Sequence, residues 1–182
     1  MFKFLEKISS QNSILIIAFK GWSDAAEAAT SSVDTIIKNY DSKKFASFEE
    51  EEFFAFARER PNIKNSKNGR IIEWPHNDLY YIDNAIDNTP LIILNGTEPH
   101  FKWKTFSKEV IDLCVSMNVS SVVTLGALLD SIPHTRGVKT QITGQHEFMP
   151  EGYTQKKISQ SKYEGPTGIT SVIIEDLSLI HI

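Results

Sequence analysis

The chain has 182 residues, of which 41% are hydrophobic and 23% charged, a balance typical of a globular protein with a substantial core. Its formal net charge of −4, with no lysine and arginine cluster to offset it, argues against a nucleic-acid-binding protein. The single cysteine, Cys114, excludes an intrachain disulfide and a cysteine-based zinc site. The apolar runs are too short to span a bilayer and the first ten residues do not resemble a signal peptide, so we expect a cytoplasmic protein.

The first β/α unit is predicted between residues 14 and 40. The continuous apolar run Ile14 to Phe19 is typical of a strand buried on both faces, and Gly21 ends it. We expect Ser23 to cap the following helix, with Asp24 and Glu27 in its first turn, where carboxylates complement the helix dipole. Apolar residues at helical spacing then line one face, at Ala26, Ala29, Val33, Ile36, Ile37 and Tyr40.

Residues 43 to 83 interrupt this β/α pattern. Aromatic residues are mixed here with the four acids Glu49 to Glu52, which we interpret as a solvated loop or edge. Asn68-Gly69 precedes the β-favouring run 70–74, a combination typical of a hairpin, and Leu79 to Ile82 is consistent with a further strand. We therefore predict an antiparallel β insertion in this part of the chain.

The β/α alternation returns after residue 90. Leu91 to Leu94 is predicted to be a second buried strand, followed by a helix from about Lys102 to Asn118 and a third strand at Ser121 to Leu125. Cys114 lies on the apolar face of that helix, so we expect a buried, inert thiol. Two further strands are predicted, at Val138 to Thr143 and at Thr170 to Ile174.

This alternation predicts a three-layer α/β/α sandwich whose sheet is mostly parallel. In open parallel sheets, ligands bind beyond the carboxyl ends of the strands. Polar residues gather after three of the predicted strands, which gives a candidate strand-end cluster of Ser23, Asp24, Glu98, His100, Trp103, His134 and Arg136.

The chemistry of these residues permits an anion-binding site. Arg136 offers a planar fork to a carboxylate or phosphate, His134 exchanges protons near neutral pH, and the helix start at Ser23 attracts anions. The alternative is structural, with Arg136 paired to Glu98 or Asp24 and the other side chains bonded to loop backbone. The sequence contains no HExxH motif, no nucleophile elbow and no phosphate loop, so we assign no metal, cofactor or catalytic residue.

Five segments follow one another along the chain: GWSDAAEAAT (21–30), EEFFAFARERP (51–61), GTEPHFKW (96–103), LGALLDSIPHTR (125–136) and YEGPTGI (163–169). Together they resemble the proteasome assembly chaperone family, in particular its bacterial and archaeal branch related to the second chaperone subunit. The resemblance covers about residues 14 to 174 and implies an α/β/α sandwich similar to the nucleoside phosphorylases. It also implies a protein that binds proteasome subunits or another protein partner, and we expect a homo-oligomer. From the charge, the short apolar runs and the motifs already considered, we expect no nucleic acid, membrane or cofactor as a partner.

Two features depart from the family pattern. Gly137 follows the Pro-His-Thr-Arg stretch where the family usually has proline, which leaves the backbone freer at that turn. Family members continue well past YEGPTGI, whereas residues 177–182 (LSLIHI) resemble the translation of a sequencing adapter. We therefore expect one α/β domain over residues 1–176, truncated at its C-terminal side and followed by a non-native tail.

We expect a non-enzymatic assembly or binding protein similar to the proteasome assembly chaperones. The alternative is an enzyme or small-molecule binder with an anion-binding site at the carboxyl edge of the sheet. Geometry separates the two hypotheses. A concave pocket lined by polar groups that have no internal partner favours a ligand, whereas internal hydrogen bonds to the same groups favour the assembly function.

Overall fold

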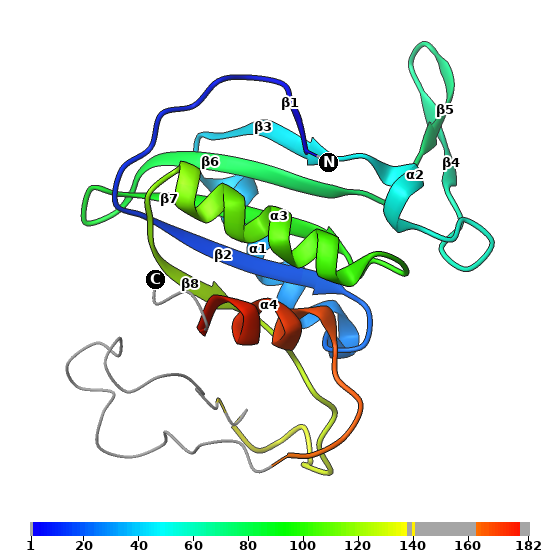
Figure 1. Ribbon diagram of the computed structural model, residues 1–182. Helices are drawn as coiled ribbons and strands as arrows, with labels where there is room; N and C mark the ends of the chain where they lie inside the picture. Colours follow the sequence, from blue (N-terminus) through cyan, green and yellow to red (C-terminus); the bar gives the residue numbers. More distant parts are fainter. Residues whose placement is uncertain (1, 138–139, 141–162, 179–182) are drawn as a thin grey trace, which may run out of the picture. The chain divides into compact units, whose positions relative to one another are not determined.

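The computed structural model of the protein describes residues 2–137, 140 and 163–178. The chain divides into two units, one made of Met1–Leu128 with Thr167–Ile182 and the other of Leu129–Pro166. The helices and strands given below belong to the first unit (Figure 1).

A six-stranded mixed sheet lies at the centre of the first unit, with the strand order β1-β3-β6-β7-β2-β8 (Figure 1). Its strands are β1 (Phe2–Phe4), β2 (Ser13–Lys20), β3 (Ser42–Phe48), β6 (Asn77–Ile86), β7 (Thr89–Thr97) and β8 (Val119–Thr124). β2 pairs in parallel with β7 and β8, whereas β1, β3, β6 and β7 pair antiparallel in succession. The predicted α/β class is confirmed. The sheet is mixed rather than mostly parallel, because the predicted insertion contributes two antiparallel strands, β3 and β6, to the main sheet.

The parallel half of the sheet follows the apolar runs of the sequence. Ile14 to Ile17 of β2 lie opposite Leu91 to Leu94 of β7, and β8 flanks β2 on its other side. Leu15, Ile17, Ile92, Ile93 and Leu94 have no exposed surface. Strands buried on both faces have no polar side, which is why these runs are continuous rather than alternating.

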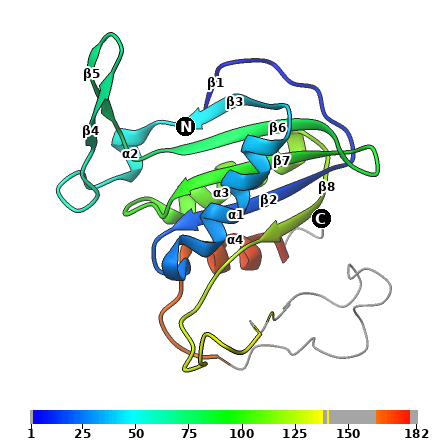
Figure 2. The same ribbon diagram turned by 180° about the vertical axis from the view of Figure 1, so that it is seen from behind.

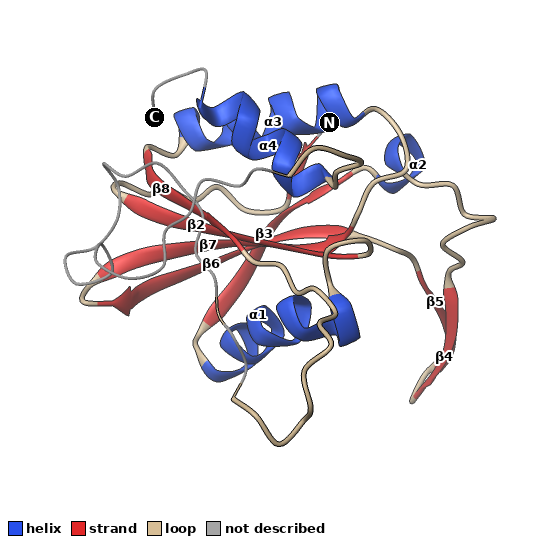
Figure 3. Ribbon diagram, turned by 90° about the horizontal axis from the view of Figure 1, so that it is seen from below, coloured by secondary structure: helices blue, strands red, loops and turns tan. Residues whose placement is uncertain are grey.

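Helices cover both faces of this sheet (Figure 3). α1 (Ala28–Asn39) lies on β2 and β7 (Figure 2). α3 (Trp103–Ser116) and α4 (Ile169–Ser178) pack against each other on the opposite face. A 3-10 turn, η1 (Ala25–Glu27), precedes α1, and the short helix α2 (Glu50–Phe53) follows β3. The three-layer sandwich is therefore confirmed.

The hydrophobic core has two parts, one on each face of the sheet. The larger cluster lies under α3 and α4 and contains an aromatic group, in which Phe48 and Phe106 stack with ring centroids 4.1 Å apart. Phe53 from α2 meets Phe106 edge-on at 5.3 Å, so the short acidic helix is anchored by its last residue. The smaller cluster lies under α1, where Ala29 and Val33 pack on the sheet.

The structure differs from two of the predictions made from the sequence. Thr170 to Ile174, predicted as a strand, belongs to helix α4. The run is rich in β-branched residues, but Ile169, Val172, Ile173 and Leu177 recur at helical spacing and pack against the larger core cluster. The acids Glu49 to Glu52, interpreted as a loop or edge, lead into and form most of α2. The strand predicted at Val138 to Thr143 lies outside the described residues.

The predicted hairpin is confirmed as a separate two-stranded sheet. β4 (Asn62–Ser66) pairs antiparallel with β5 (Gly69–Glu73), and Ser66 faces Gly69 across the turn. Gly69 has a φ of +118°, a conformation that residues with a side chain rarely adopt.

The end of α4 bears on the predicted tail. Leu177 and Ser178, the first two residues of the predicted non-native tail, complete this helix, and Leu177 packs against the larger core cluster. Residues 179–182 lie outside the described part of the chain. The boundaries of the domain and of the tail stay predictions. None of the described helices is long and apolar enough to cross a membrane.

The aromatic core gives a stability prediction. We expect Phe106→Ala to lower the free energy of unfolding by about 3–5 kcal/mol, because the ring is fully buried against Phe48 and Phe53. Phe101→Ala is the matched control, since Phe101 is 50% exposed and its removal leaves no cavity. Urea denaturation measures both values. Equal values for the two variants would contradict this description of the core.

Candidate functional site

The turns that follow β2 and β7 meet at the carboxyl edge of the parallel strands. Lys20, the last residue of β2, lies in register with Thr97, the last residue of β7. The contact between the two segments continues beyond the end of β7, because the Glu98 backbone N–H donates to the Lys20 carbonyl at 2.9 Å. The two predicted polar turns are therefore brought side by side by the parallel pairing itself.

Gly21 allows the two turns to approach closely. Its φ of +144° is rarely available to residues with a side chain. A Cβ atom at this position would also lie 3.0 Å from Glu98 Cβ and 3.1 Å from Glu98 Oε2. Glycine is thus required both by the turn and by the neighbouring glutamate.

The Glu98 carboxylate joins three separate segments. Its Oε2 accepts a hydrogen bond from the Trp22 backbone N–H at 3.3 Å, and its Oε1 accepts one from the Ile169 N–H at 2.8 Å. Ile169 is the first residue of α4, so a negative charge lies at the N-terminus of that helix, where it is favourable. Both carboxylate oxygens therefore have internal partners.

Asp24 holds the start of α1 in a similar way. Its side chain is buried, and Oδ1 accepts hydrogen bonds from the backbone N–H groups of Ala29 at 2.7 Å and Thr30 at 3.4 Å. Its Oδ2 accepts from the Thr30 hydroxyl at 2.5 Å. The cap predicted at Ser23 is therefore wrong. Asp24 takes this function because η1, with Ala26 and Glu27 at a φ of 56°, turns the chain back so that α1 starts only at Ala28.

The third predicted turn begins at the same edge. The Ala127 backbone N–H donates to the Ser23 carbonyl at 2.8 Å, and the Ala25 N–H donates to the Ala127 carbonyl at 3.0 Å. These bonds form a parallel bridge between Asp24 and Ala127, directly beyond the strand pair β2 and β8. The ends of three strands thus contribute backbone to this edge.

His100 and Trp103 fix the turn after β7 to neighbouring backbone. The Ala55 N–H donates to His100 Nδ1 at 3.3 Å, and the His100 N–H donates to the Phe53 carbonyl at 2.8 Å. Since Nδ1 accepts, the proton of the neutral ring is on Nε2. The Trp103 indole N–H donates to the Pro99 carbonyl at 2.5 Å. Both side chains therefore have structural partners.

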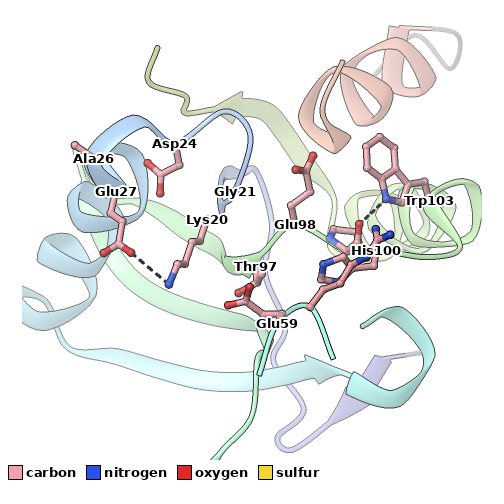
Figure 4. Close-up of a pocket in the computed structure, with 12 residues that line it drawn as sticks. Lys20, Gly21, Asp24, Ala26, Glu27, Glu59, Thr97, Glu98, His100 and Trp103 are labelled. Atoms are coloured by element: carbon pink, nitrogen blue, oxygen red, sulfur yellow. Dashed lines mark hydrogen bonds and ion pairs between the residues drawn. The ribbon is translucent and has the colours of Figure 1, made fainter. Parts of the chain in front are cut away.

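A cavity of about 510 Å³ lies between these turns (Figure 4). Lys20 and Glu27 form an ion pair across part of its wall, with Nζ and Oε1 3.3 Å apart, and Figure 4 shows the two side chains pointing toward each other. The remaining lining residues are Gly21, Asp24, Ala26, Arg58, Glu59, Thr97, Glu98, Pro99, His100 and Trp103.

The predicted cluster is partly assembled in the described structure. Asp24, Glu98, His100 and Trp103 line the cavity, while Ser23 lies beside it, with its hydroxyl oxygen 3.1 Å from where a Cβ on Gly168 would be. His134 and Arg136 belong to the other unit, where the Arg136 N–H donates to the Pro133 carbonyl at 3.0 Å. Their part in the site, and ion pairing of Arg136 with either acid, stay predictions.

Arg58, Glu59 and Thr97 also line the cavity, although they are not part of the cluster predicted from the sequence. Thr97 ends β7 in register with Lys20, so the parallel pairing was a usable signal. Arg58 and Glu59 follow α2, and they reach the cavity because His100 bonds to the backbone of Phe53 and Ala55. Such a contact between distant segments leaves no local pattern in the sequence.

Cys114 lies away from this cavity, in the larger core cluster. Burial raises the pKa of its thiol to about 12, which keeps it protonated and poorly nucleophilic near neutral pH. The prediction of a buried, inert thiol is confirmed. Among the residues that the structure describes, no group of three or more His, Cys, Asp or Glu side chains is placed to hold a metal ion.

Comparison with known proteins identifies the family. The model of the PAC2 family matches residues 18–182. The chain belongs to the PAC2 family. This confirms the resemblance to the proteasome assembly chaperones. A comparison with curated protein sequences gave no match.

Several crystal structures share the fold of this PAC2-family chain. A PAC2 family protein from Streptomyces avermitilis is 29% identical with a TM-score of 0.83, over 93% of this chain and 72% of that one. A proteasome-assembly chaperone homologue from Mycobacterium tuberculosis is 28% identical with a TM-score of 0.79, over 93% and 71%. PbaB from Pyrococcus furiosus, an archaeal proteasome activator, is 17% identical with a TM-score of 0.71, over 100% and 76%, and supports the fold alone.

Removal of the Glu98 carboxylate tests its linking function. We expect Glu98→Ala to lower the free energy of unfolding by about 1–3 kcal/mol, because two backbone N–H groups lose their acceptor. Glu98→Gln keeps one acceptor oxygen and is expected to have an intermediate effect. Hydrogen exchange gives the local measurement, since α4 loses its N-terminal cap in the Ala variant. Unchanged protection of Ile169–Ser178 would contradict the capping function.

The raised thiol pKa predicts a loss of stability at alkaline pH. Above about pH 9 the unfolded chain loses the Cys114 proton while the folded chain retains it, up to the folded pKa of about 12. The free energy of unfolding therefore falls as pH rises, by at most about 1.4 kcal/mol per pH unit for this group. Tyr80, whose pKa is raised to about 12 mainly by burial, acts in the same direction above pH 10. Urea denaturation of the native chain and of Cys114→Ala between pH 8 and 10 measures the difference in slope, and equal slopes would contradict the prediction.

Proposed function

We propose that the protein is a non-enzymatic assembly or binding protein that resembles the proteasome assembly chaperones. It binds proteasome subunits and acts in the cytoplasm as a homo-oligomer. The observation that carries this proposal is the PAC2 family match over residues 18–182. The 28% identity to a proteasome-assembly chaperone homologue over 93% of the chain supports the choice of partner.

The strand-end geometry is consistent with a binding protein. Asp24 and Glu98, the two acids of the predicted cluster in the first unit, have hydrogen-bond donors at both of their oxygens. Three of these four oxygens accept from backbone N–H groups, and the fourth, Asp24 Oδ2, accepts from the Thr30 hydroxyl. Carboxylates held in this way fix the relative positions of turns and helices. This arrangement supports the hypothesis in which the polar edge stabilises a surface for a protein partner.

The alternative is a small-molecule binder that uses the same edge. Its support is the cavity of about 510 Å³, since ligand pockets usually measure about 300–1,000 Å³. Lys20 and Arg58 are its cationic lining residues, although Lys20 already pairs with Glu27. The acidic lining residues outnumber these two cations, which disfavours an anion as the occupant of the cavity.

Binding to the proteasome tests the leading proposal. The chain is mixed with purified α-type proteasome subunits of its host, and the products are separated by size-exclusion chromatography with light scattering. We expect a complex of defined mass that an unrelated acidic protein of the same size does not form. Absence of such a complex, together with a small molecule retained in native mass spectrometry, would favour the alternative.

A further inference from the structure

The hairpin β4–β5 stands apart from the six-stranded sheet, and we call residues 58–74, the hairpin with its flanks, the arm. The arm begins at the cavity, which Arg58 and Glu59 help to line. β4 and β5 pair only with each other within the described chain, and every residue of both strands is exposed. Figures 1 and 2 show the hairpin extending away from the sheet beside α2. A two-stranded hairpin is at best marginally stable in water by itself, so an arm of this kind gains stability from a partner surface.

One face of the arm carries a group of apolar side chains toward its base. Ile63 and Ile72 lie opposite each other on this face, and Trp74, two residues after Ile72, lies on the same face. The pair Asn65 and Arg70 lies on this face nearer the turn. The exposed fractions of Ile63, Ile72 and Trp74 are 60%, 56% and 44%. Trp74 contacts Phe56, with ring centroids 4.8 Å apart, so the apolar group continues to the base of the arm.

The opposite face of the arm is different. It carries an ion pair between Lys64 Nζ and Glu73 Oε2 at 2.6 Å, and Ile71 is its one large apolar residue in β4 and β5. Ile71 is 51% exposed, similar to Ile63 and Ile72. The arm therefore has one surface suited to packing and one suited to solvent.

The charge of the arm is opposite to that of the rest of the chain. Residues 58–74 contain five basic residues and two acidic residues, a net charge of +3. Since the whole chain carries −4, the remainder carries −7. The basic residues are Arg58, Arg60, Lys64, Lys67 and Arg70.

An acidic run lies at the base of the arm. Glu49 and Glu51 are exposed and Glu50 is half-buried, next to and within α2. The fourth acid, Glu52, is already engaged by Lys102, whose charge lowers the pKa of its carboxyl. The ion pairs of the described residues do not include one between Glu49, Glu50 or Glu51 and a cation of the arm. Positive and negative surfaces thus lie side by side without neutralising each other.

We propose that the arm is a self-association surface that docks on a second copy of this chain. The apolar faces of the two arms pack together, and the basic residues of each arm face Glu49, Glu50 and Glu51 of the other copy. This inference rests on the self-association included in the proposed function and names the surface that produces it.

The charges favour a second copy over an unrelated acidic partner. In a two-fold symmetric dimer, each surface patch meets the same patch of the other copy, so the patch must be complementary to itself. A basic arm beside an acidic run satisfies this condition, because each arm meets the partner's run. An acidic partner of another kind would pair with the arm and leave Glu49, Glu50 and Glu51 without cations.

The apolar face is tested first. We expect Ile63→Ser with Ile72→Ser to weaken self-association by roughly tenfold or more for each isoleucine, because burial of this side chain is lost. Ile71→Ser is the matched control, being the same substitution at a similarly exposed position on the opposite face. Sedimentation equilibrium over a range of protein concentrations measures the association constants. Circular dichroism and urea denaturation check that the variants keep their fold.

Exchanging the charges of the arm and of the acidic run tests whether each arm faces the acidic run of the other copy. The variant Lys67→Glu with Arg70→Glu has an acidic arm, and the variant Glu50→Lys with Glu51→Lys has a basic run. Each alone is expected to be monomeric, because like charges face each other across the dimer. Mixed together, they are expected to form a heterodimer, since each arm again meets a run of opposite charge.

Three outcomes would overturn the proposal. If the unmodified chain remains monomeric at all concentrations, self-association is rejected. Binding to proteasome subunits is tested separately and does not depend on this result. A native dimer that the Ile63 and Ile72 changes weaken no more than Ile71→Ser keeps self-association and rejects the arm. Arm variants that keep the dimer but lose binding to the proteasome subunits would assign the arm to that partner instead.

Discussion

The carboxylate of Glu98 connects segments that lie far apart in the sequence. It follows the end of β7, bonds to the turn after β2 through Trp22, and caps α4 through Ile169. The parallel pairing of β2 and β7 places it there, and glycine at position 21 leaves the space that its side chain occupies. A carboxylate that accepts backbone N–H bonds at a helix start is stabilised by the helix dipole. One side chain therefore couples the sheet to a helix of the outer layer.

Asp24 repeats this arrangement on the other face of the sheet, where it caps α1. Two acids at one sheet edge thus fix helices of both outer layers. The same strand-end position that often holds a ligand in parallel sheets is here bonded largely to the protein's own backbone. The cavity between the turns keeps Lys20, Arg58 and Glu59 as charged groups that are not held in this way by backbone. Because Asp24 and Glu98 already have partners within the protein, we prefer a protein that binds other proteins over one that binds a small molecule at this edge.

The sequence predicted features that depend on local pattern. Continuous apolar runs predicted β2 and β7, and apolar residues at helical spacing predicted α1 and α3. Burial on both faces of a strand, or on one face of a helix, leaves these patterns in the sequence. The position of β3 and β6 in the main sheet depends on pairing between distant strands, which has no such signal. Thr170 to Ile174 has β-branched residues typical of a strand, but packing on α3 and the cap from Glu98 make it a helix. The sequence predicted the cap of α1 at Ser23, one residue before Asp24, because it could not show that η1 shifts the start of the helix to Ala28. Arg58 and Glu59 were missed because only a tertiary contact brings them to the cavity.

The contrast between side chains that already have hydrogen-bond partners and side chains that remain exposed also indicates where binding of a partner is favourable. At the strand-end edge, Asp24 and Glu98 already have hydrogen-bond donors, so a partner there does not gain by supplying them. On the arm, the apolar side chains of Ile63, Ile72 and Trp74 remain in water. Their burial is favourable for any complementary surface, and the adjacent charges select which surface that is. Glu98 thus joins strands and a helix within the fold, whereas the arm, in the self-association that we propose, supplies the contact with a second copy.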